Sequence, residues 1–372
     1  MDEFLEGNDA VVRGALDAGC RFFAGYPITP ASSILAGMMR ELPPVGGVAI
    51  QAEDEIAAIG FCIGASMAGW KTLTATSGPG ISLYSENIGL AIMGETPLVI
   101  VDVQRLGPAT GGATSGAEGD IQFLRWATSG GLPVIVLSPS TVAECYALTI
   151  HAFNLAERFR VPVFLASSKE VGMTRERVDL TRAERPPVLE RLRAAAGDEF
   201  VPYRVGHPAE VPPMADIGGS HLVRYTTSMH DERGHITRDP HKIQRKVGHL
   251  EAKIAAAAGE IAMVREDLAP GAEDLVVAYG VTARSAREAV GEARARGRRV
   301  SLLTLQMLFP VPEGAIRRAL AGARRVIVPE MNLGQYRLEI ERLAGGRDVV
   351  GVHRMDSQLI SPAQILEALD VP

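Results

Sequence analysis

Short apolar runs alternate with helical patterns through residues 8–169, and the same alternation returns through residues 274–369. Strands that are apolar on both faces are typical of parallel sheets that helices cover on both sides. Parallel strands also need a long crossover between them, and the helical segments supply it. The pattern therefore predicts an α/β fold with a parallel sheet in each part of the chain.

The middle of the chain separates two predicted domains. A length of 372 residues is typical of two domains. From residue 174 onward Arg, Glu, Pro and His become more frequent and the strand pattern fades, and residues 239–267 then show a helical pattern. We therefore assign residues 1–195 to the first domain, 196–267 to a linker with a docking helix, and 268–372 to a second, smaller domain.

The predicted elements follow from periodicity. Strands are expected at 21–26, 48–51, 71–77, 97–104, 133–138, 161–167, 275–279, 299–305, 324–330 and 349–352. Helices are expected at 30–40, 54–68, 80–93, 141–158, 283–296 and 312–320.

Composition and charge exclude several classes of function. A net charge of −6 gives no basic surface for nucleic acid. Cys20, Cys62 and Cys145 lie far apart, so they cannot hold a four-cysteine cluster, and isolated cysteines fit a reducing cytoplasm. The acidic N-terminus does not resemble a signal peptide, and no apolar run is long enough for a membrane span. We expect a cytoplasmic protein that binds neither nucleic acid nor membrane.

The common nucleotide and metal motifs are missing. No G-x-G-x-x-G follows a predicted strand, and there is no G-x-x-x-x-G-K-[ST] sequence. No set of His, Cys and carboxylate residues has the spacing of metal ligands, so no metal site is predicted within this chain.

The stretch GYPITPASS, residues 25–33, places one hydroxyl between two prolines where a strand passes into a helix. Proline fixes its own φ and restricts the preceding residue, so Thr29 lies in a stiffened segment. Thr29 could either cap the following helix or contact a ligand.

An acidic group opens the next helix at residues 53–55 and is followed by small and apolar residues only. Carboxylates at a helix N-terminus are stabilised by the helix dipole, which accounts for them without any function. Glu55, however, directly precedes the apolar run, so we expect it to face the interior. An interior carboxylate at this position could hydrogen-bond or protonate a nitrogen of a ligand.

Two further segments follow strands. Ser77-Gly78-Pro79-Gly80 makes a tight turn into a helix, where glycine allows a ligand to approach the backbone, although Ser77 could also be a plain cap. Arg105 stands at the mouth of a loop rich in Gly and hydroxyl residues, where it could bind a carboxylate or remain solvated. Because these segments all follow parallel strands, one site at the carboxyl edge of the sheet could collect them.

This set of motifs resembles the α subunit of ferredoxin-dependent 2-oxoacid oxidoreductases. The resemblance covers nearly the whole chain. It rests on GYPITPASS, AEDEIAAIGFCIGASMAG, TATSGPGISL, QRLGPATGG, the LFPVP at 308–312 and the PEMNLGQ at 329–335.

The resemblance implies a thiamine-diphosphate enzyme with a pyrimidine-binding domain first and a transketolase C-terminal-like domain second. It implies that Glu55 contacts the aminopyrimidine ring, that Thr29 lies beside the reacting carbons, and that Arg105 binds a substrate carboxylate. The catalytic residues would be Thr29, Glu55 and Arg105; the cofactor-binding residues Tyr26, Pro27, Ile28, Glu55, Ser77, Gly78 and Pro79; and the substrate-binding residues Thr29, Arg105 and Thr110.

The resemblance also implies partners. The usual GDG motif for Mg²⁺ and the diphosphate is absent, since Gly119-Asp120 is followed by Ile121. Mg²⁺, half of the thiamine-diphosphate site and a [4Fe-4S] cluster would therefore lie in a β subunit, in a heterodimer or an α₂β₂ heterotetramer. Coenzyme A would be the co-substrate and ferredoxin the electron partner. No segment resembles the family's γ subunit.

The substrate is less well determined by the sequence. The Arg105 loop is more similar to the 2-oxoglutarate branch than to the pyruvate branch, but residues 112–120 lack the proline, basic residue and glutamine common in that branch. Pyruvate or a branched-chain 2-oxoacid stays open, as do the β chain of a lipoamide-linked dehydrogenase and a non-catalytic interaction subunit. Residues 224–233 could line coenzyme A or form a surface loop, and residues 329–335 are expected at a subunit boundary.

Overall fold

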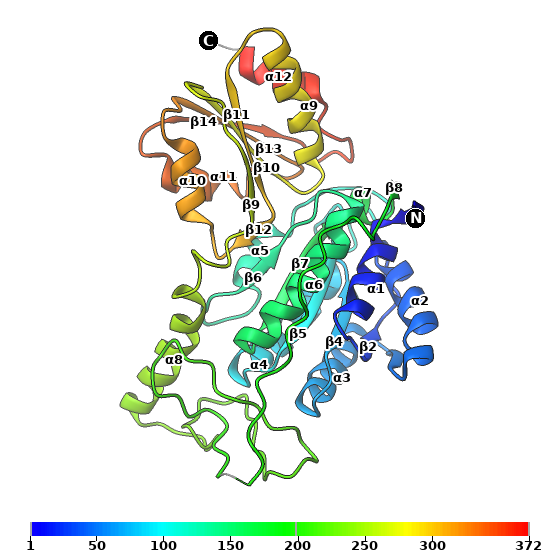
Figure 1. Ribbon diagram of the computed structural model, residues 1–372, viewed down its shortest axis with the longest axis vertical. Helices are drawn as coiled ribbons and strands as arrows, with labels where there is room; N and C mark the ends of the chain where they lie inside the picture. Colours follow the sequence, from blue (N-terminus) through cyan, green and yellow to red (C-terminus); the bar gives the residue numbers. More distant parts are fainter. Residues whose placement is uncertain (1, 198, 371–372) are drawn as a thin grey trace.

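The computed structural model of this chain describes residues 2–197 and 199–370, which form two lobes with a loop-rich middle segment at one end (Figure 1). The sheet of the first lobe has the strand order β12-β6-β7-β5-β4-β2-β3. Its strands are β2 (Phe22–Gly25), β3 (Val48–Gln51), β4 (Thr72–Thr76), β5 (Leu98–Gln104), β6 (Ile135–Leu137), β7 (Pro162–Ser168) and β12 (Met307–Phe309). Neighbours are parallel except β12 and β6, so the predicted parallel sheet is confirmed.

Helices cover both faces of this sheet because its strands are apolar on both sides. In β5, Val99, Val101 and Val103 belong to one core cluster, and Leu98 and Ile100 to the other. The first face carries α1 (Gly7–Asp17), α2 (Ser32–Glu41) and α6 (Val142–Phe159). The second carries α3 (Glu55–Met67), α4 (Gly78–Met93) and α5 (Ile121–Trp126).

The second lobe is a smaller sheet with the order β14-β13-β10-β11-β9. Its strands are β9 (Val264–Asp267), β10 (Asp274–Tyr279), β11 (Val300–Leu305), β13 (Arg325–Glu330) and β14 (Asp348–His353), with only β9 antiparallel among them. One face packs on α9 (Thr282–Ala295) and α12 (Pro362–Asp370). The other packs on α10 (Glu313–Leu320) and α11 (Arg337–Ala344).

The middle segment begins with α7 (Lys169–Gly172) and β8 (Arg175–Val178), which pairs antiparallel with β1 (Glu3–Glu6). Residues 179–197 and 199–239 then run mainly as loops. In the first lobe, a 3-10 turn, η1 (Pro43–Val45), follows α2. Helix α8 (Pro240–Ala255) begins after Asp239, whose side chain caps it, and lies along the first lobe (Figure 1).

One expectation about an element was wrong, and one strand was not expected. The helix expected through residue 267 ends at Ala255, and Val264–Asp267 forms β9 at the edge of the second sheet. Residues 307–309, which lie within the second predicted domain, pair with β6 of the first sheet. Both strands are short edge strands, so they show little of the alternation on which a prediction from sequence depends.

A buried ion cluster holds α8 against the first lobe. Lys246 Nζ lies 2.6 Å from Glu95 Oε1, and both His249 Nε2 and Lys253 Nζ lie 2.9 Å from Glu95 Oε2. Burial alone would raise the pKa of Glu95, but Lys253 and Lys246 hold that pKa well below its usual value. Burial also lowers the pKa of Lys253 to about 8. The cluster therefore depends on every charge keeping its partner.

Candidate active site

The carboxyl ends of β2, β3, β4 and β5 meet at one edge of the first sheet, because these strands are parallel. The segments that follow them carry most of the site residues expected from the sequence. Residues 26–31 follow β2, Glu55 lies just after β3, Ser77 follows β4, and Arg105 follows β5. The predicted convergence on a single edge is therefore observed.

Arg105 bonds the main chain of two other expected residues. Its Nη1 donates to the Thr29 carbonyl at 2.6 Å, and its Nη2 donates to the Thr110 carbonyl at 3.0 Å. Only 6% of Arg105 is exposed, and its Nε–H has no hydrogen-bond partner in the described residues. The guanidinium thus fixes the geometry of two loops, and binding of a substrate carboxylate by Arg105 stays a prediction.

Thr29 does not cap the helix that follows it. Helix α2 begins at Ser32, and its N-cap is Ala31. The Thr29 carbonyl is occupied by Arg105, while its half-buried hydroxyl makes no hydrogen bond within residues 2–197 and 199–370. The Pro30 carbonyl accepts a hydrogen bond from Asn8 Nδ2 at 2.9 Å. The Thr29 and Pro30 carbonyls are thus both held, and the Thr29 hydroxyl remains available to a ligand.

Glu55 faces the interior, as the sequence predicted. Asp54 is the N-cap of α3 and accepts from the Ala57 amide at 2.7 Å, whereas Glu55 is only 7% exposed. A Cβ at Gly80 would lie 2.9 Å from Glu55 Cγ, so glycine is needed where α4 passes this side chain. The Glu55 carboxylate makes no hydrogen bond within the described part of the chain. A largely buried carboxylate of this kind is destabilising unless a ligand provides a partner.

The turn at residues 77–80 is also open to a ligand. Ser77 is buried at the N-cap of α4, but its side chain makes no capping hydrogen bond and its Oγ lacks a partner among the described residues. The alternative of a plain cap is therefore not supported. The free amides at the start of α4 could donate hydrogen bonds to a ligand, and Gly78 has no side chain that would keep the ligand from the backbone.

The remaining cofactor-binding candidates form the rim of this edge. Tyr26 is 38% exposed, Pro27 is exposed, and Ile28 packs partly against the core. No hydrogen bond links them to Glu55 or Ser77 in the described residues. Their contact with a cofactor stays a prediction.

The sequence analysis missed a pair of carboxylic acids that lie next to the turn at residues 77–80. Asp102 is fully buried in β5, and Asp120 is the N-cap residue of α5. A Cβ at Gly78 would lie 2.9 Å from Asp120 Oδ2, so Asp120 lies directly against the turn. Burial raises the pKa of Asp102 well above its usual value and that of Asp120 to about 6. Since adjacent buried carboxylates do not both ionise, the pair holds a proton near neutral pH. The signal in the sequence was an Asp inside the apolar strand Leu98–Gln104.

Glu118 is a third buried acid, at the boundary between the lobes. It is 2% exposed, and its Oε1 accepts from the Val281 amide at 2.9 Å. Burial, with the nearby carboxylates Glu170 and Glu330, raises the pKa of Glu118 to about 8 in spite of lowering by the Val281 amide and the Ser168 side chain. Glu118 is thus protonated at neutral pH.

A Glu118→Gln variant is expected to flatten the dependence of stability on pH. Because the pKa of Glu118 is higher in the folded chain than its ordinary value of 4.5, its contribution to stability is lost as pH rises toward 8. Relative to the wild type, the variant should gain on the order of a few kcal/mol of unfolding free energy between pH 5 and 8. Urea unfolding at several pH values in this window measures it.

The matched control is Glu288→Gln, which changes an exposed residue of α9. Its free energy of unfolding should run parallel to that of the wild type across the same pH range. If Glu118→Gln also ran parallel, Glu118 would be ionised in the folded protein and the assignment of its proton would be wrong.

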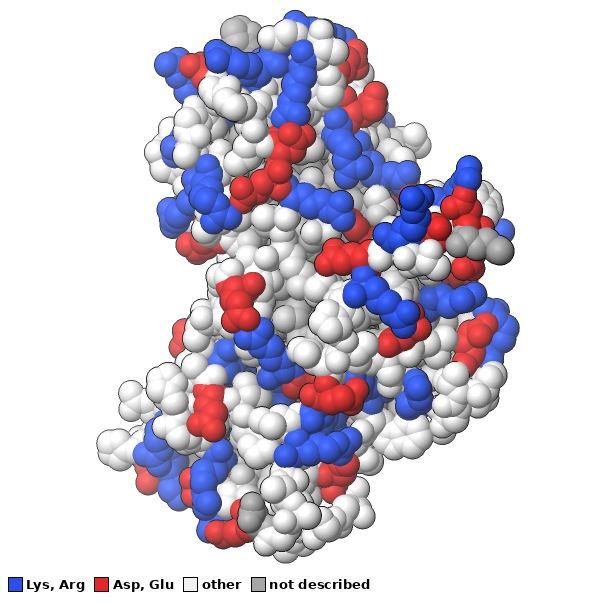
Figure 2. All heavy atoms as spheres, viewed as in Figure 1, with Lys and Arg blue, Asp and Glu red and all other residues white. Residues whose placement is uncertain are grey.

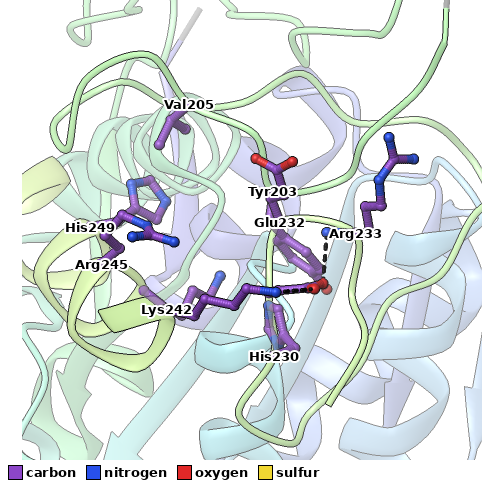
Figure 3. A pocket seen from close by; sticks show the side chains of 10 residues that line it. Tyr203, Val205, His230, Glu232, Arg233, Lys242, Arg245 and His249 are labelled. Carbon is purple, nitrogen blue, oxygen red and sulfur yellow. Dashed lines mark hydrogen bonds and ion pairs between the residues drawn. The ribbon is translucent and has the colours of Figure 1, made fainter. Parts of the chain in front are cut away.

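A second cavity, of about 470 Å³, lies beside α8 and is lined by residues of the middle segment (Figure 3). Two of its cations are paired: Lys242 Nζ lies 3.2 Å from Asp231 Oδ2, and Arg233 Nη2 donates to Glu199 at 2.8 Å. Lys246, besides its bond to Glu95, lies 4.2 Å from the centre of the Tyr203 ring. We assign this cavity to the packing of α8, which favours the surface-loop interpretation of residues 224–233.

The visible surface carries both signs of charge without a large patch of either (Figure 2). The hollow between the two lobes is mainly uncharged on this face (Figure 2). None of the helices within residues 2–197 and 199–370 is both long and apolar enough to cross a membrane.

The fold and the site define a thiamine-diphosphate-binding class of oxidoreductase. Residues 13–249 match the family of thiamine-diphosphate-binding domains of pyruvate flavodoxin/ferredoxin oxidoreductases, and residues 272–365 match core domain II of pyruvate:ferredoxin oxidoreductase. The chain belongs to this family. The resemblance seen in the sequence is therefore confirmed.

Individual relatives show which members of the family this chain is similar to. The chain is 42% identical to the 2-oxoglutarate synthase subunit KorA of Methanocaldococcus jannaschii, over 99% of both chains. It is 38% identical to the ketoisovalerate oxidoreductase subunit VorB of Methanothermobacter thermautotrophicus, over 99% of this chain and 97% of that one. A solved 2-oxoglutarate:ferredoxin oxidoreductase from Magnetococcus marinus, with 2-oxoglutarate, coenzyme A and succinyl-CoA bound, matches with a TM-score of 0.91 and 31% identity. That match covers 99% of this chain but 64% of the longer solved chain.

Proposed function

We propose that this chain is the α subunit of a thiamine-diphosphate-dependent 2-oxoacid:ferredoxin oxidoreductase. Its reaction would convert 2-oxoglutarate and coenzyme A to succinyl-CoA and CO₂ with reduction of ferredoxin, in either direction. The observation that carries the class is Glu55, a buried carboxylate without an internal partner beside an open, glycine-containing turn. Near-full-length similarity to 2-oxoglutarate synthase subunits favours 2-oxoglutarate over a branched-chain 2-oxoacid.

The residues at the edge fit the pyrimidine half of the cofactor. Glu55 would accept a hydrogen bond from the ring, the Ser77–Pro79 backbone would line it, and Tyr26, Pro27 and Ile28 would form its wall. Thiamine diphosphate supplies the electron sink that decarboxylation of a 2-oxoacid requires. The chain's own contribution is to hold the ring through Glu55 and to orient the substrate through the Thr29 hydroxyl and the Arg105 loop.

The other half of the cofactor site would come from a β subunit that also holds Mg²⁺ and a [4Fe-4S] cluster. Among the described residues no group of His, Cys, Asp and Glu could bind a metal, and all three cysteines are buried. Burial raises the pKa of the Cys20 thiol to about 12, so it remains protonated. A cluster ligand needs a thiolate, and these buried thiols do not offer one.

Helix α3 presents a face that a partner subunit could cover. Ile56 and Phe61 are 50% and 43% exposed. A Cβ added at Gly60 or at Gly64 would meet no other atom within 4 Å. Small residues at a spacing of four allow another chain to approach the helix backbone. Ile56 follows Glu55 directly in α3, so a partner that covers this face would also lie next to the cofactor site.

Substrate-dependent reduction of a viologen dye tests the proposal. The chain is co-expressed anaerobically with its β partner and supplied with thiamine diphosphate, Mg²⁺ and coenzyme A. Reduction should depend on coenzyme A and be fastest with 2-oxoglutarate, ahead of pyruvate and branched-chain 2-oxoacids. A preference for a different acid would correct the substrate alone.

The same assay separates the enzyme classes. A complex that holds its cofactor and cluster yet reduces no viologen with any 2-oxoacid would contradict the proposal. Transfer of the acyl group to lipoamide instead would identify the lipoamide-linked dehydrogenase class.

A further inference from the structure

The loop from Arg105 to Asp120 is ordered at its start by the first lobe alone. Arg105 ties it to the Thr29 and Thr110 carbonyls. Inside the loop the Leu106 amide donates to the Ser115 carbonyl at 2.8 Å, and the Gly112 amide donates to the Leu106 carbonyl at 2.8 Å. At the far end the first lobe adds one bond, from the Asp120 amide to Gln104 Oε1 at 3.0 Å, and the second lobe supplies further bonds.

The far end is held by a turn of the second lobe, Met331–Gln335, which we name the clamp turn. The Glu118 amide donates to the Met331 carbonyl at 2.9 Å. Asn332 Nδ2 donates to the Glu118 carbonyl at 2.7 Å, and Gln335 Nε2 donates to the Gly119 carbonyl at 2.6 Å. Each of these bonds ends on a main-chain atom of the loop. They therefore fix the path of the loop backbone and do not act on any single side chain of the loop.

Gln335 also fixes the first turn of α5, directly after Asp120. Its Oε1 accepts from the Gln122 amide at 2.9 Å, and its carbonyl accepts from Gln122 Nε2 at 2.9 Å. Asp120 is thus braced on both sides by Gln335. Since Asp120 lies against Gly78, the clamp turn is connected to the Ser77–Pro79 turn through one residue.

The clamp turn is itself rigid. Asn332 is fully buried, and its Oδ1 accepts from the Gly334 and Gln335 amides at 2.8 and 2.9 Å. Its Nδ2 reaches Tyr279 Oη at 2.8 Å in addition to the Glu118 carbonyl. Gly334 has a φ of +87°, which glycine adopts without strain. Because both the Oδ1 and the Nδ2 of Asn332 are hydrogen-bonded, the side chain fixes the clamp turn on one side and the loop at Glu118 on the other.

We propose that the clamp turn is the positioning element of the 2-oxoacid site, with Asn332 and Gln335 as positioning residues that do not touch the substrate. The turn holds the far end of the loop, and with it Asp120, at the carboxyl edge of the first sheet, next to the start of the loop that carries Arg105 and Thr110. The inference rests on the proposed function of that edge. It explains why the second lobe, which supplies none of the site residues expected from the sequence, carries a polar turn at this boundary.

The clamp turn is not what keeps the lobes docked. Strand β12 pairs with β6, the Ser138 amide donates to the Gln306 carbonyl at 2.8 Å, and Gln306 Nε2 donates to Glu144 at 3.0 Å. These contacts are distant in sequence from the clamp turn and do not involve it. Loss of the Gln335 side chain should therefore loosen the loop and leave the lobes together.

The test begins with hydrogen–deuterium exchange on the α–β complex of a Gln335→Leu variant. Amides of residues 118–122, within the segment 105–122, should exchange about tenfold faster than in the wild type, since the bonds from the Gln335 side chain to the Gly119 carbonyl and the Gln122 amide are lost. Peptides from β13 and α11, on either side of the clamp turn, should keep their wild-type rates. Gln335→Glu keeps the acceptor for the Gln122 amide but not the donor to Gly119, so its exchange should be intermediate.

Kinetics give the second readout. In Gln335→Leu the KM for 2-oxoglutarate should rise about tenfold, while the KM for coenzyme A and the bound thiamine diphosphate stay unchanged. The matched control, Gln364→Leu, removes a partly buried glutamine of the same lobe that bonds Arg354 and Ser361. It should change neither exchange in the loop nor either KM.

Wild-type exchange through residues 105–122 in Gln335→Leu would overturn the proposal whatever the kinetics show. A fall in kcat with an equal change in every KM would also overturn it, because that pattern reports general loosening. If the wild-type complex turned over no 2-oxoacid, the proposed function would fail, and the exchange experiment would still decide whether the clamp turn orders the loop.

Discussion

A Glu55→Ala variant of the α–β complex is expected to lose at least about a hundredfold in kcat for coenzyme A-dependent viologen reduction. The reason is that Glu55 combines a carboxylate, burial and the absence of a hydrogen-bond partner among the described residues, beside the glycine-containing turn that begins α4. Without it the cofactor ring would lose the hydrogen bond that favours its reactive form. Steady-state rates at saturating 2-oxoglutarate, with thiamine diphosphate content measured on the same sample, check the prediction.

Stability should move in the opposite direction to activity. Removing a buried carboxylate that no protein group satisfies relieves a desolvation penalty, so the melting temperature should stay constant or rise. Glu53→Ala is the matched control, because Glu53 lies in the same acidic group but is exposed. It should retain wild-type turnover. Full activity in Glu55→Ala would instead support the non-catalytic interaction subunit.

A Glu95→Gln variant is expected to lose about 3–5 kcal/mol of unfolding free energy. Glu95 is fully buried among Lys246, His249 and Lys253, and the amide would leave the two ammonium groups without a counter-charge. Glutamine has nearly the same shape, so the loss would report charge and not a cavity. Urea unfolding near neutral pH measures the difference.

The control for Glu95 is an ion pair at the surface. Glu260 is 66% exposed, and solvent screens its pair with Arg158, so the pair should add little to stability. Glu260→Gln should therefore unfold almost as the wild type does. A Glu95→Gln variant with the same small effect would show that Lys246 and Lys253 deprotonate or reach solvent at little cost.

The sequence predicted the fold because its strands are apolar on both faces. Runs such as Leu98–Gln104 can be satisfied only by a sheet with helices on each side, and the structure has that arrangement. Short edge strands escaped this reasoning. Val264–Asp267 is polar and partly exposed, and it becomes a strand only because β11 offers it an unpaired edge.

The candidate site, like the fold, could be predicted from the sequence only in part. The positions of Glu55, Ser77 and Arg105 at one edge follow from the rule that parallel strands end together. The target of Arg105 could not be predicted, because its bonds to the Thr29 and Thr110 carbonyls depend on how two loops fold back. The expected placement of residues 329–335 at a subunit boundary did not anticipate their bonds to the loop at 118–122 within the same chain.

By itself the sequence determined the α/β class, the family and the strand ends at which chemistry could occur, because these depend on local periodicity and short motifs. Only the tertiary structure decided which groups meet. Asp102 with Asp120, Glu118 with Val281, and Glu95 with the cations of α8 are far apart along the chain. Their protonation and stability arise from burial and from neighbours brought together by folding, and no local pattern in the chain encodes that proximity.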